Sequence, residues 1–239
     1  MILRIGIENN IEGRSLAWAL DLPGCFSYGP DSGSAIIAMP RAAVDYQAWM
    51  EAHTPDPWLK LGDFDVRLVD TWDVYFIDDS LAVAEKGYEV NAWFRDDWIP
   101  LCEEEISRGL ALLNWSRMDL LDAVKGLPQK VLEARLPGER WHISGILRHV
   151  ATAENWYLDR LGLAACPHAD LPQEAAARLE LTREHLRRVL PTLAGRADLV
   201  RGVNGEFWSP RKLLRRAVWH ERDHVAHIHK LVAAMAEKA

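Results

Sequence analysis

The chain has 239 residues, of which 49% are hydrophobic and 26% are charged, and this composition is typical of a globular protein with a substantial core. Its net charge of −7 opposes nonspecific attraction to nucleic acid, because a duplex repels an acidic partner. No apolar run reaches the roughly 18 to 20 residues that span a bilayer, the first residues lack a signal peptide, and the three cysteines are scattered, so a cytoplasmic location without membrane contact is expected.

The first part of the chain is predicted to form a small unit of strands with one helix. Side chains alternate between apolar and polar over residues 2–8, and a second extended run at residues 15–20 leads through a Pro-Gly turn into residues 26–29. Apolar residues then recur every three or four positions from Ala35 to His53, which predicts a covering helix. Further extended segments at residues 64–68, 72–77 and 88–94 give a small α+β unit with mostly antiparallel strands.

From residue 97 the pattern is helical, and it predicts four amphipathic helices. Ser144 is the expected N-cap of the second helix, and Ser209 followed by Pro210 marks the start of the fourth. The expected helices span residues 103–124, 144–162, 172–190 and 209–235. Four such helices favour a bundle, so we predict an α+β protein with one domain at residues 1–96 and a four-helix bundle at residues 97–239.

Six of the nine histidines lie in the second and fourth predicted helices, at positions 142, 149, 220, 224, 227 and 229. His220 and His224 are four residues apart, so their side chains project within about 40° of each other on a helix. Two imidazoles at this spacing can share one metal ion, but they cannot complete its coordination. A third ligand must therefore come from another segment.

The segment from His220 to His224 also reads HExxH, which would indicate a zinc metalloprotease with Glu221 as general base. The chain after His224 offers no HxxGxxH extension and no second ligand helix, so we set this interpretation aside. The other candidate for third ligand is His149. A lone histidine on an apolar face is more often a packed core residue, so His149 by itself would not indicate a metal site.

Two segments, WHISGILRHVATAENWYLDRL and WSPRKLLRRAVWHERDHVAHIHKL, resemble the DinB-like superfamily, over residues 97–239 in all. In that family a histidine of the second helix and an HxxxH pair of the fourth hold one metal, usually zinc or nickel. The resemblance implies that His149, His220 and His224 bind a divalent metal ion. Because the metal needs neutral imidazole, affinity is expected to fall below about pH 6 to 6.5. His227 lies on the same stripe and remains open as an additional ligand, whereas His142 and His229 are expected to be structural or surface groups.

Three histidines leave a coordination position open, which is typical of a reactive site. Known activities in the resembled superfamily include transferases and isomerases that use a low-molecular-weight thiol, so the resemblance implies a metal-dependent thiol transferase with a small-molecule substrate. Arg216 is a candidate to bind a cosubstrate carboxylate, with a salt bridge as the alternative. Glu221 is a candidate to orient a ligand or water, with pairing to an arginine as the alternative.

Residues 15–50 resemble the HicB-like fold of antitoxins through a strand, a PGCxxxG turn and a helix. Typical antitoxins continue into a DNA-binding segment, but here the helical domain stands in that place, which argues against a repressor. The HicB-like domain is instead expected to serve oligomerisation, ligand recognition or covering of the bundle. This leaves a second functional hypothesis open, a non-catalytic binding or toxin–antitoxin-related interaction module with a structural metal, and it leaves a homodimer open.

Overall fold

The structure is a computed structural model that describes residues 1–237, and it divides into two compact units. The first unit comprises Met1–Ile99 with Val200–Arg215, and the second comprises Pro100–Leu199 with Arg216–Ala239. The α+β class predicted from the sequence is confirmed, since a strand-rich segment is followed by a helical one. None of the helices within residues 1–237 is long and apolar enough to cross a bilayer.

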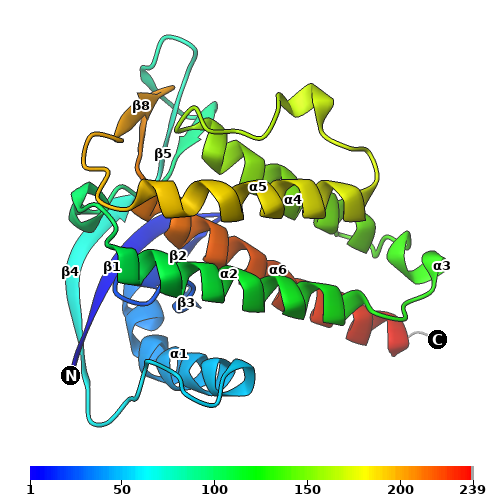
Figure 1. Cartoon of the computed structure of the whole chain (residues 1–239), viewed down its shortest axis with the longest axis horizontal. Helices are drawn as coiled ribbons and strands as arrows, with labels where there is room; N and C mark the ends of the chain where they lie inside the picture. The colour runs from blue at the N-terminus through cyan, green and yellow to red at the C-terminus, as the bar shows by residue number, and fades with distance from the viewer. Residues whose placement is uncertain (238–239) are drawn as a thin grey trace. The chain divides into compact units, whose positions relative to one another are not determined.

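A four-stranded sheet with the order β3-β2-β1-β4 organises the first unit (Figure 1). Its strands are β1 (Ile2–Ile11), β2 (Arg14–Ala19), β3 (Phe26–Gly29) and β4 (Asp65–Asp73). Strand β1 pairs antiparallel with β2 and parallel with β4, and β2 pairs antiparallel with β3. The side chains of Leu3, Ile5 and Ile7 on β1 are fully buried, so this central strand carries the core that the alternating pattern predicts.

Helix α1 (Ser32–His53) packs on this sheet through one apolar stripe. The carboxylate of Asp31 accepts a hydrogen bond from the backbone N–H of Ser34 at 2.7 Å and so caps the start of the helix. The stripe has the three- and four-residue spacing of a buried helix face and consists of Ala35, Met39, Ala43, Tyr46 and Met50. This confirms the covering helix expected from the sequence.

Residues 200–215 belong to the first unit, although the sequence-based division places them with the helices. The smaller strands of this unit are β5 (Tyr75–Ile77), β6 (Val83–Ala84), β7 (Tyr88–Val90), β8 (Arg201–Val203) and β9 (Glu206–Trp208). Tyr88 donates a hydrogen bond to Glu206, and the fully buried Lys212 pairs with Glu206 at 2.7 Å. Arg215 reaches Asp97 at 2.6 Å. The contacts of Tyr88 with Glu206 and of Arg215 with Asp97 each connect residues 118 positions apart, which sequence patterns do not reveal.

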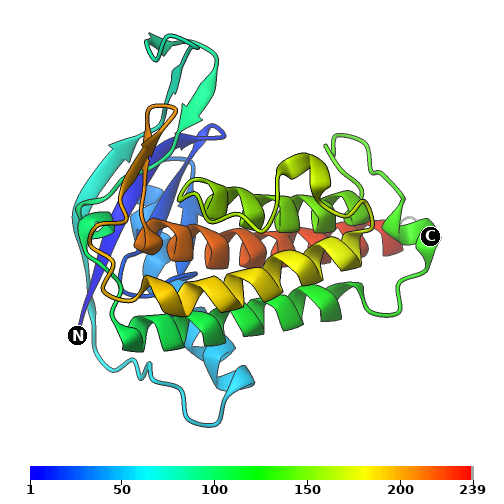
Figure 2. The ribbon, with the colours of Figure 1, turned by 45° about the horizontal axis from the view of Figure 1, so that its top comes forward.

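The second unit contains the predicted four-helix bundle. Figures 1 and 2 show its long helices running alongside one another. They are α2 (Glu103–Val124), α4 (Ile143–Asp159), α5 (Ala175–Val189) and α6 (Pro210–Ala236), the last from Arg216 onward. Shorter elements are α3 (Gln129–Leu132) and the 3-10 turns η1 (Arg95–Trp98, in the first unit), η2 (His168–Asp170) and η3 (Leu190–Leu193). One apolar cluster draws on all four long helices, through residues that include Leu120, Ile146, Leu179 and Ile228.

The expected N-cap of α4 at Ser144 is wrong. The helix begins at Ile143, and the cap is His142, whose Nδ1 accepts a hydrogen bond from the backbone N–H of Gly145 at 3.2 Å. Ser144 is buried within the first turn, where its hydroxyl donates to the carbonyl oxygen of Leu132 at 3.4 Å. The serine was a plausible cap by residue type, but imidazole can accept the same hydrogen bond.

Candidate metal centre

Three histidines of the bundle point their Nε2 atoms at one another. His149 lies on α4, and His220 and His224 lie one turn apart on α6. The Nε2 atom of His220 is 3.0 Å from that of His149 and 3.2 Å from that of His224. All three offer a ligand nitrogen within 4.8 Å of the others. The structure therefore brings together the three residues that the sequence proposed as metal ligands.

The spacing of these nitrogens fits a divalent metal ion. Two ligands of a tetrahedral ion with metal–nitrogen bonds of 2.0–2.1 Å lie about 3.3 Å apart. A neutral imidazole nitrogen carries either one hydrogen or one lone pair, so the Nε2 of His220 cannot form good hydrogen bonds to both other rings. A cation that accepts one lone pair from each ring is compatible with the whole arrangement. The donor set suits zinc, nickel and other imidazole-binding metals.

Burial keeps all three imidazoles neutral. It lowers the pKa of His149 to about 4, with a smaller contribution from the charge of Arg140. It lowers the pKa of His224 to about 3, assisted by His149 and His227. The pKa of His220 also lies well below its ordinary value, first through burial and then through the neighbouring His224 and His149. The loss of metal affinity expected below pH 6 to 6.5 is therefore moved down towards pH 4, because buried ligands resist protonation.

Aromatic rings hold the histidines in place. The ring of Trp141 stacks on that of His149, with centroids 4.3 Å apart and planes inclined by 24°. Tyr157 and Trp219 contact His220 at centroid distances of 6.0 and 5.8 Å. The Nδ1 atom of His224 is buried and has no hydrogen-bond partner within the part of the chain that the structure describes. Packing therefore orients this ring, in place of the hydrogen bond that often fixes a metal-binding histidine.

The other histidines of the two helix regions lie outside this cluster. His227 is directed to Glu139, with its Nε2 2.9 Å from a carboxylate oxygen, so the structure does not bring it into the cluster. His142 caps α4, and His229 is exposed. Helix spacing alone leaves His227 open as an additional ligand, because it lies on the same stripe as His220. The acidic loop residue that attracts it could not be foreseen from helix spacing.

Glu221 is buried, and both of its carboxylate oxygens are engaged by neighbouring helices. It accepts hydrogen bonds from Ser116 at 2.5 Å, from Arg117 at 2.6 Å and from Arg183 at 2.7 Å. Burial by itself would raise the pKa of Glu221, but the charges of Arg183 and Arg117 outweigh it and lower the pKa. This is the arginine pairing that the sequence left open as the alternative to a ligand-orienting role. It also agrees with setting aside the metalloprotease, whose general base must reach a water molecule.

The contacts of Glu221 belong to an ionic cluster that joins all four long helices, which we call the buried ionic cluster: Arg117 on α2, Glu154 on α4, Arg183 on α5 and Glu221 on α6. Arg183 contacts Glu154 at 2.6 Å, and Arg117 contacts it at 3.4 Å. Each of these four side chains is no more than 7% exposed. Local sequence patterns do not predict this cluster. Its available signal was a charged residue placed among the apolar positions of each helix, one in each.

Arg216 lies close to the histidines but is not a surface residue. It is 7% exposed, and its guanidinium carbon lies 4.8 Å from the centre of the Trp219 ring. Its positive charge contributes to the lowered pKa of His220, after burial and the other two histidines. The structure thus places this candidate beside the cluster, stacked on an aromatic side chain.

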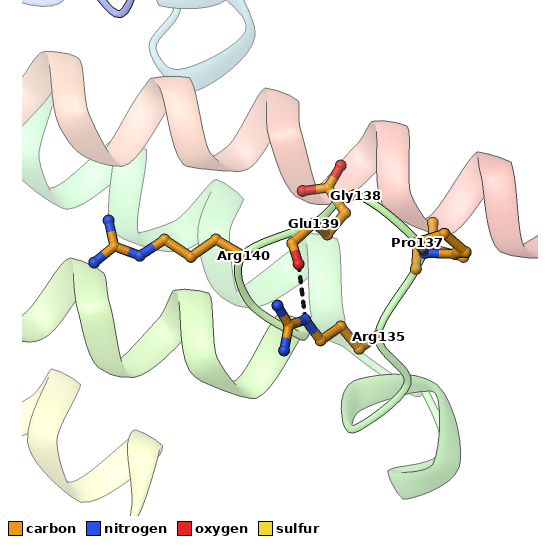
Figure 3. Close-up of a pocket in the computed structure, with 6 residues that line it drawn as sticks. Arg135, Pro137, Gly138, Glu139 and Arg140 are labelled. Atoms are coloured by element: carbon orange, nitrogen blue, oxygen red, sulfur yellow. Dashed lines mark hydrogen bonds between the residues drawn. The ribbon is translucent and has the colours of Figure 1, made fainter.

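A shallow cavity lies at the loop before α4, and no sequence pattern predicts it (Figure 3). It is largely open to solvent, and its volume is about 490 Å³. Its lining consists of Arg135, Leu136, Pro137, Gly138, Glu139 and Arg140. We call these six residues the basic loop. The residue that follows them is Trp141, which stacks on His149.

The part of the chain that contains the three histidines also matches a known family. Residues 112–228 match the sequence model of the DinB superfamily, and this span contains His149, His220 and His224 as well as the buried ionic cluster. No curated protein matches the chain. Residues 112–228 therefore form a DinB-like domain, a type of domain that commonly binds metal, and its three histidines form a candidate metal site.

Proposed function

We propose that the DinB-like domain at residues 112–228 is a metal-dependent transferase that activates a low-molecular-weight thiol. The observation that supports this most is the convergence of three neutral imidazoles with no fourth ligand side chain in their group, within residues 1–237. A closed structural site normally has four protein ligands, whereas three ligands leave a position for a substrate. Zinc and nickel are the metals we expect, because both accept imidazole nitrogen.

The residues of the chain would act by binding and positioning. A divalent ion held by the three histidines would supply a Lewis acid that lowers the pKa of a thiol. In the transfer, the thiol loses its proton to solvent, its sulfur forms a bond to an electrophilic carbon, and a leaving group departs from that carbon with the bonding electrons. The low pKa values of His149 and His224 keep their lone pairs available for the ion. Trp141, Tyr157 and Trp219 restrict access of water to the imidazoles that they contact.

The proposal is tested by loading the full chain with zinc or nickel and measuring thiol consumption with a chlorinated nitroarene as electrophile. We expect one equivalent of metal and turnover that requires both metal and thiol. His149→Ala should lose metal and turnover together, whereas His229→Ala, at an exposed position outside the site, should retain both. Full metal binding without any thiol-dependent turnover would contradict the transferase.

A second candidate is a non-catalytic interaction module in which the metal is structural and the first unit binds a partner. Residues 15–50 contain β2, a turn, β3 and α1, and Gly24 in the turn has a φ of 85°; this turn and helix are the features on which the resemblance to the HicB-like fold rests. Exposed aromatic residues of the same unit also favour a binding surface, since Trp98 is 54% and Phe207 is 47% exposed. Their rings lie 5.8 Å apart and both contact Trp93.

Light scattering tests whether this aromatic surface joins two copies of the chain. If it joins two copies of the chain, the full-length protein should be a homodimer, and Phe207→Ser should shift it to monomer without loss of metal. Exposed Leu81→Ser, a comparable loss of apolar surface in the same unit, is the matched control and should leave the mass unchanged. A monomeric wild-type chain would argue against a homodimer formed through this surface.

A further inference from the structure

The basic loop carries two exposed arginines whose surroundings leave them available to a ligand. Arg135 donates a hydrogen bond from Nε to the backbone carbonyl of Glu139 at 2.7 Å, as the dashed line in Figure 3 marks. This contact holds the side chain against the loop while its two Nη groups remain for another acceptor. The carboxylate of Glu139 is directed to His227 at 2.9 Å, so the one acidic lining residue is paired elsewhere. The cavity therefore presents net positive charge.

The same loop lies beside the candidate metal centre. The guanidinium carbon of Arg140 is 4.4 Å from the centre of the Trp141 ring, and that ring stacks on His149 at 4.3 Å. The charge of Arg140 is also close enough to contribute to the lowered pKa of His149. A charged group bound at Arg140 would therefore be separated from His149, one candidate ligand of the metal, by a single indole ring. That is the scale of a small thiol with a charged group several bonds from its sulfur.

We propose that Arg135 and Arg140 of the basic loop each bind a carboxylate of the thiol cosubstrate, and so select an acidic low-molecular-weight thiol; this rests on the proposed thiol transferase. A guanidinium can hold a carboxylate through two parallel hydrogen bonds, which gives both charge and geometry to the recognition. Arg216, the arginine that the sequence offers as a candidate, is 7% exposed and lies over Trp219. The exposed basic loop is better placed to receive a solute.

The test uses cobalt-loaded protein, whose visible spectrum changes when a thiolate binds the metal. Glutathione is compared with its diethyl ester, which keeps the thiol but has no free carboxylate. We expect wild-type protein to prefer glutathione, and Arg140→Gln and Arg135→Gln each to weaken its binding about tenfold without affecting the ester, which corresponds to about 1.4 kcal/mol. Arg196→Gln, which removes an exposed arginine paired with Asp198, is the control and should change neither affinity. Equal affinity of wild-type protein for glutathione and the ester would overturn the proposal.

A second titration separates the basic loop from the thiol chemistry. S-methylglutathione keeps both carboxylates but cannot become a thiolate, and its binding is measured by calorimetry. If neither glutathione nor its diethyl ester alters the cobalt spectrum, the transferase proposal fails. Binding of S-methylglutathione then tests by itself whether the basic loop binds carboxylates. Binding that Arg140→Gln weakens and Arg196→Gln does not would support the carboxylate site. Failure of wild-type protein to bind S-methylglutathione, in that case, would overturn it.

Discussion

The Nε2 atoms of His149 and His220 lie 3.0 Å apart, although 71 positions separate the two residues in the chain. A metal ion at this point would connect α4 to α6, so its removal should destabilise the bundle. With free metal at 100 times its dissociation constant, linkage gives about 2.7 kcal/mol of stabilisation. We expect the melting temperature of wild-type protein to fall on chelation and that of His149→Ala to be lower and indifferent to the chelator. The same melting curve with metal and with chelator would show that the ion does not bridge these helices.

Metal retention should extend to acidic pH. Because burial lowers the pKa of His149 to about 4 and that of His224 to about 3, the folded ligands stay neutral at pH 5.5. We expect protein dialysed at pH 5.5 to keep its metal and protein dialysed at pH 3 to lose it, as measured by elemental analysis. Release with a midpoint near pH 6.5 would mean that the histidines titrate as exposed groups.

The metal-free protein should lose stability as the pH falls. An unfolded histidine titrates near pH 6.5, whereas folded His149 titrates at about pH 4, so between these values the unfolded chain binds more protons. The free energy of unfolding therefore decreases as the pH is lowered from about 6.5 to about 4. Urea denaturation at pH 7.5 and pH 4.5 measures this loss, and His149→Asn should reduce it. If the variant shows the same pH dependence as wild-type protein, His149 does not contribute to it.

The buried ionic cluster should be sensitive to the loss of a single member. Removing Arg183 leaves Glu154 and Glu221 buried with one arginine fewer between them, and breaking a buried pair in this way costs about 3–5 kcal/mol. We expect Arg183→Ala to lower the free energy of unfolding by this order, measured by urea denaturation. Arg196→Ala, which breaks the exposed pair with Asp198, is the control and should cost less than about 1 kcal/mol. Comparable losses in both variants would refute a special role for the cluster.

Much of the fold could be predicted from local signals. Helix α2 has the bounds that its acidic first turn and following Gly126 indicate, and α6 starts at Pro210 as predicted. The histidine cluster could also be predicted from the sequence. The HxxxH spacing places the side chains of His220 and His224 on one face of a helix, and the family resemblance adds His149 as the third ligand. These are cases in which a few neighbouring residues, or a known motif, determine the outcome.

The missed features all depend on which segments meet in space. Arg117 and Glu154 looked like ordinary helix charges, and only the packing of four helices brings them together out of water. The contacts of Tyr88 with Glu206 and of Arg215 with Asp97 likewise connect residues 200–215 to the rest of the first unit. The basic loop has no periodic pattern. Only the stacking of Trp141 on His149 shows that its arginines lie beside the candidate metal centre.

X-ray absorption spectroscopy of zinc-loaded protein tests the central claim most directly, because it counts the ligands of the metal. We predict three imidazole nitrogens at about 2.0–2.1 Å and one exchangeable ligand that becomes sulfur when a thiol is added. In His149→Ala one imidazole should disappear from any metal that remains bound. A zinc ion with fewer than three imidazoles in the wild-type protein, or an unchanged ligand count in the variant, would contradict this site.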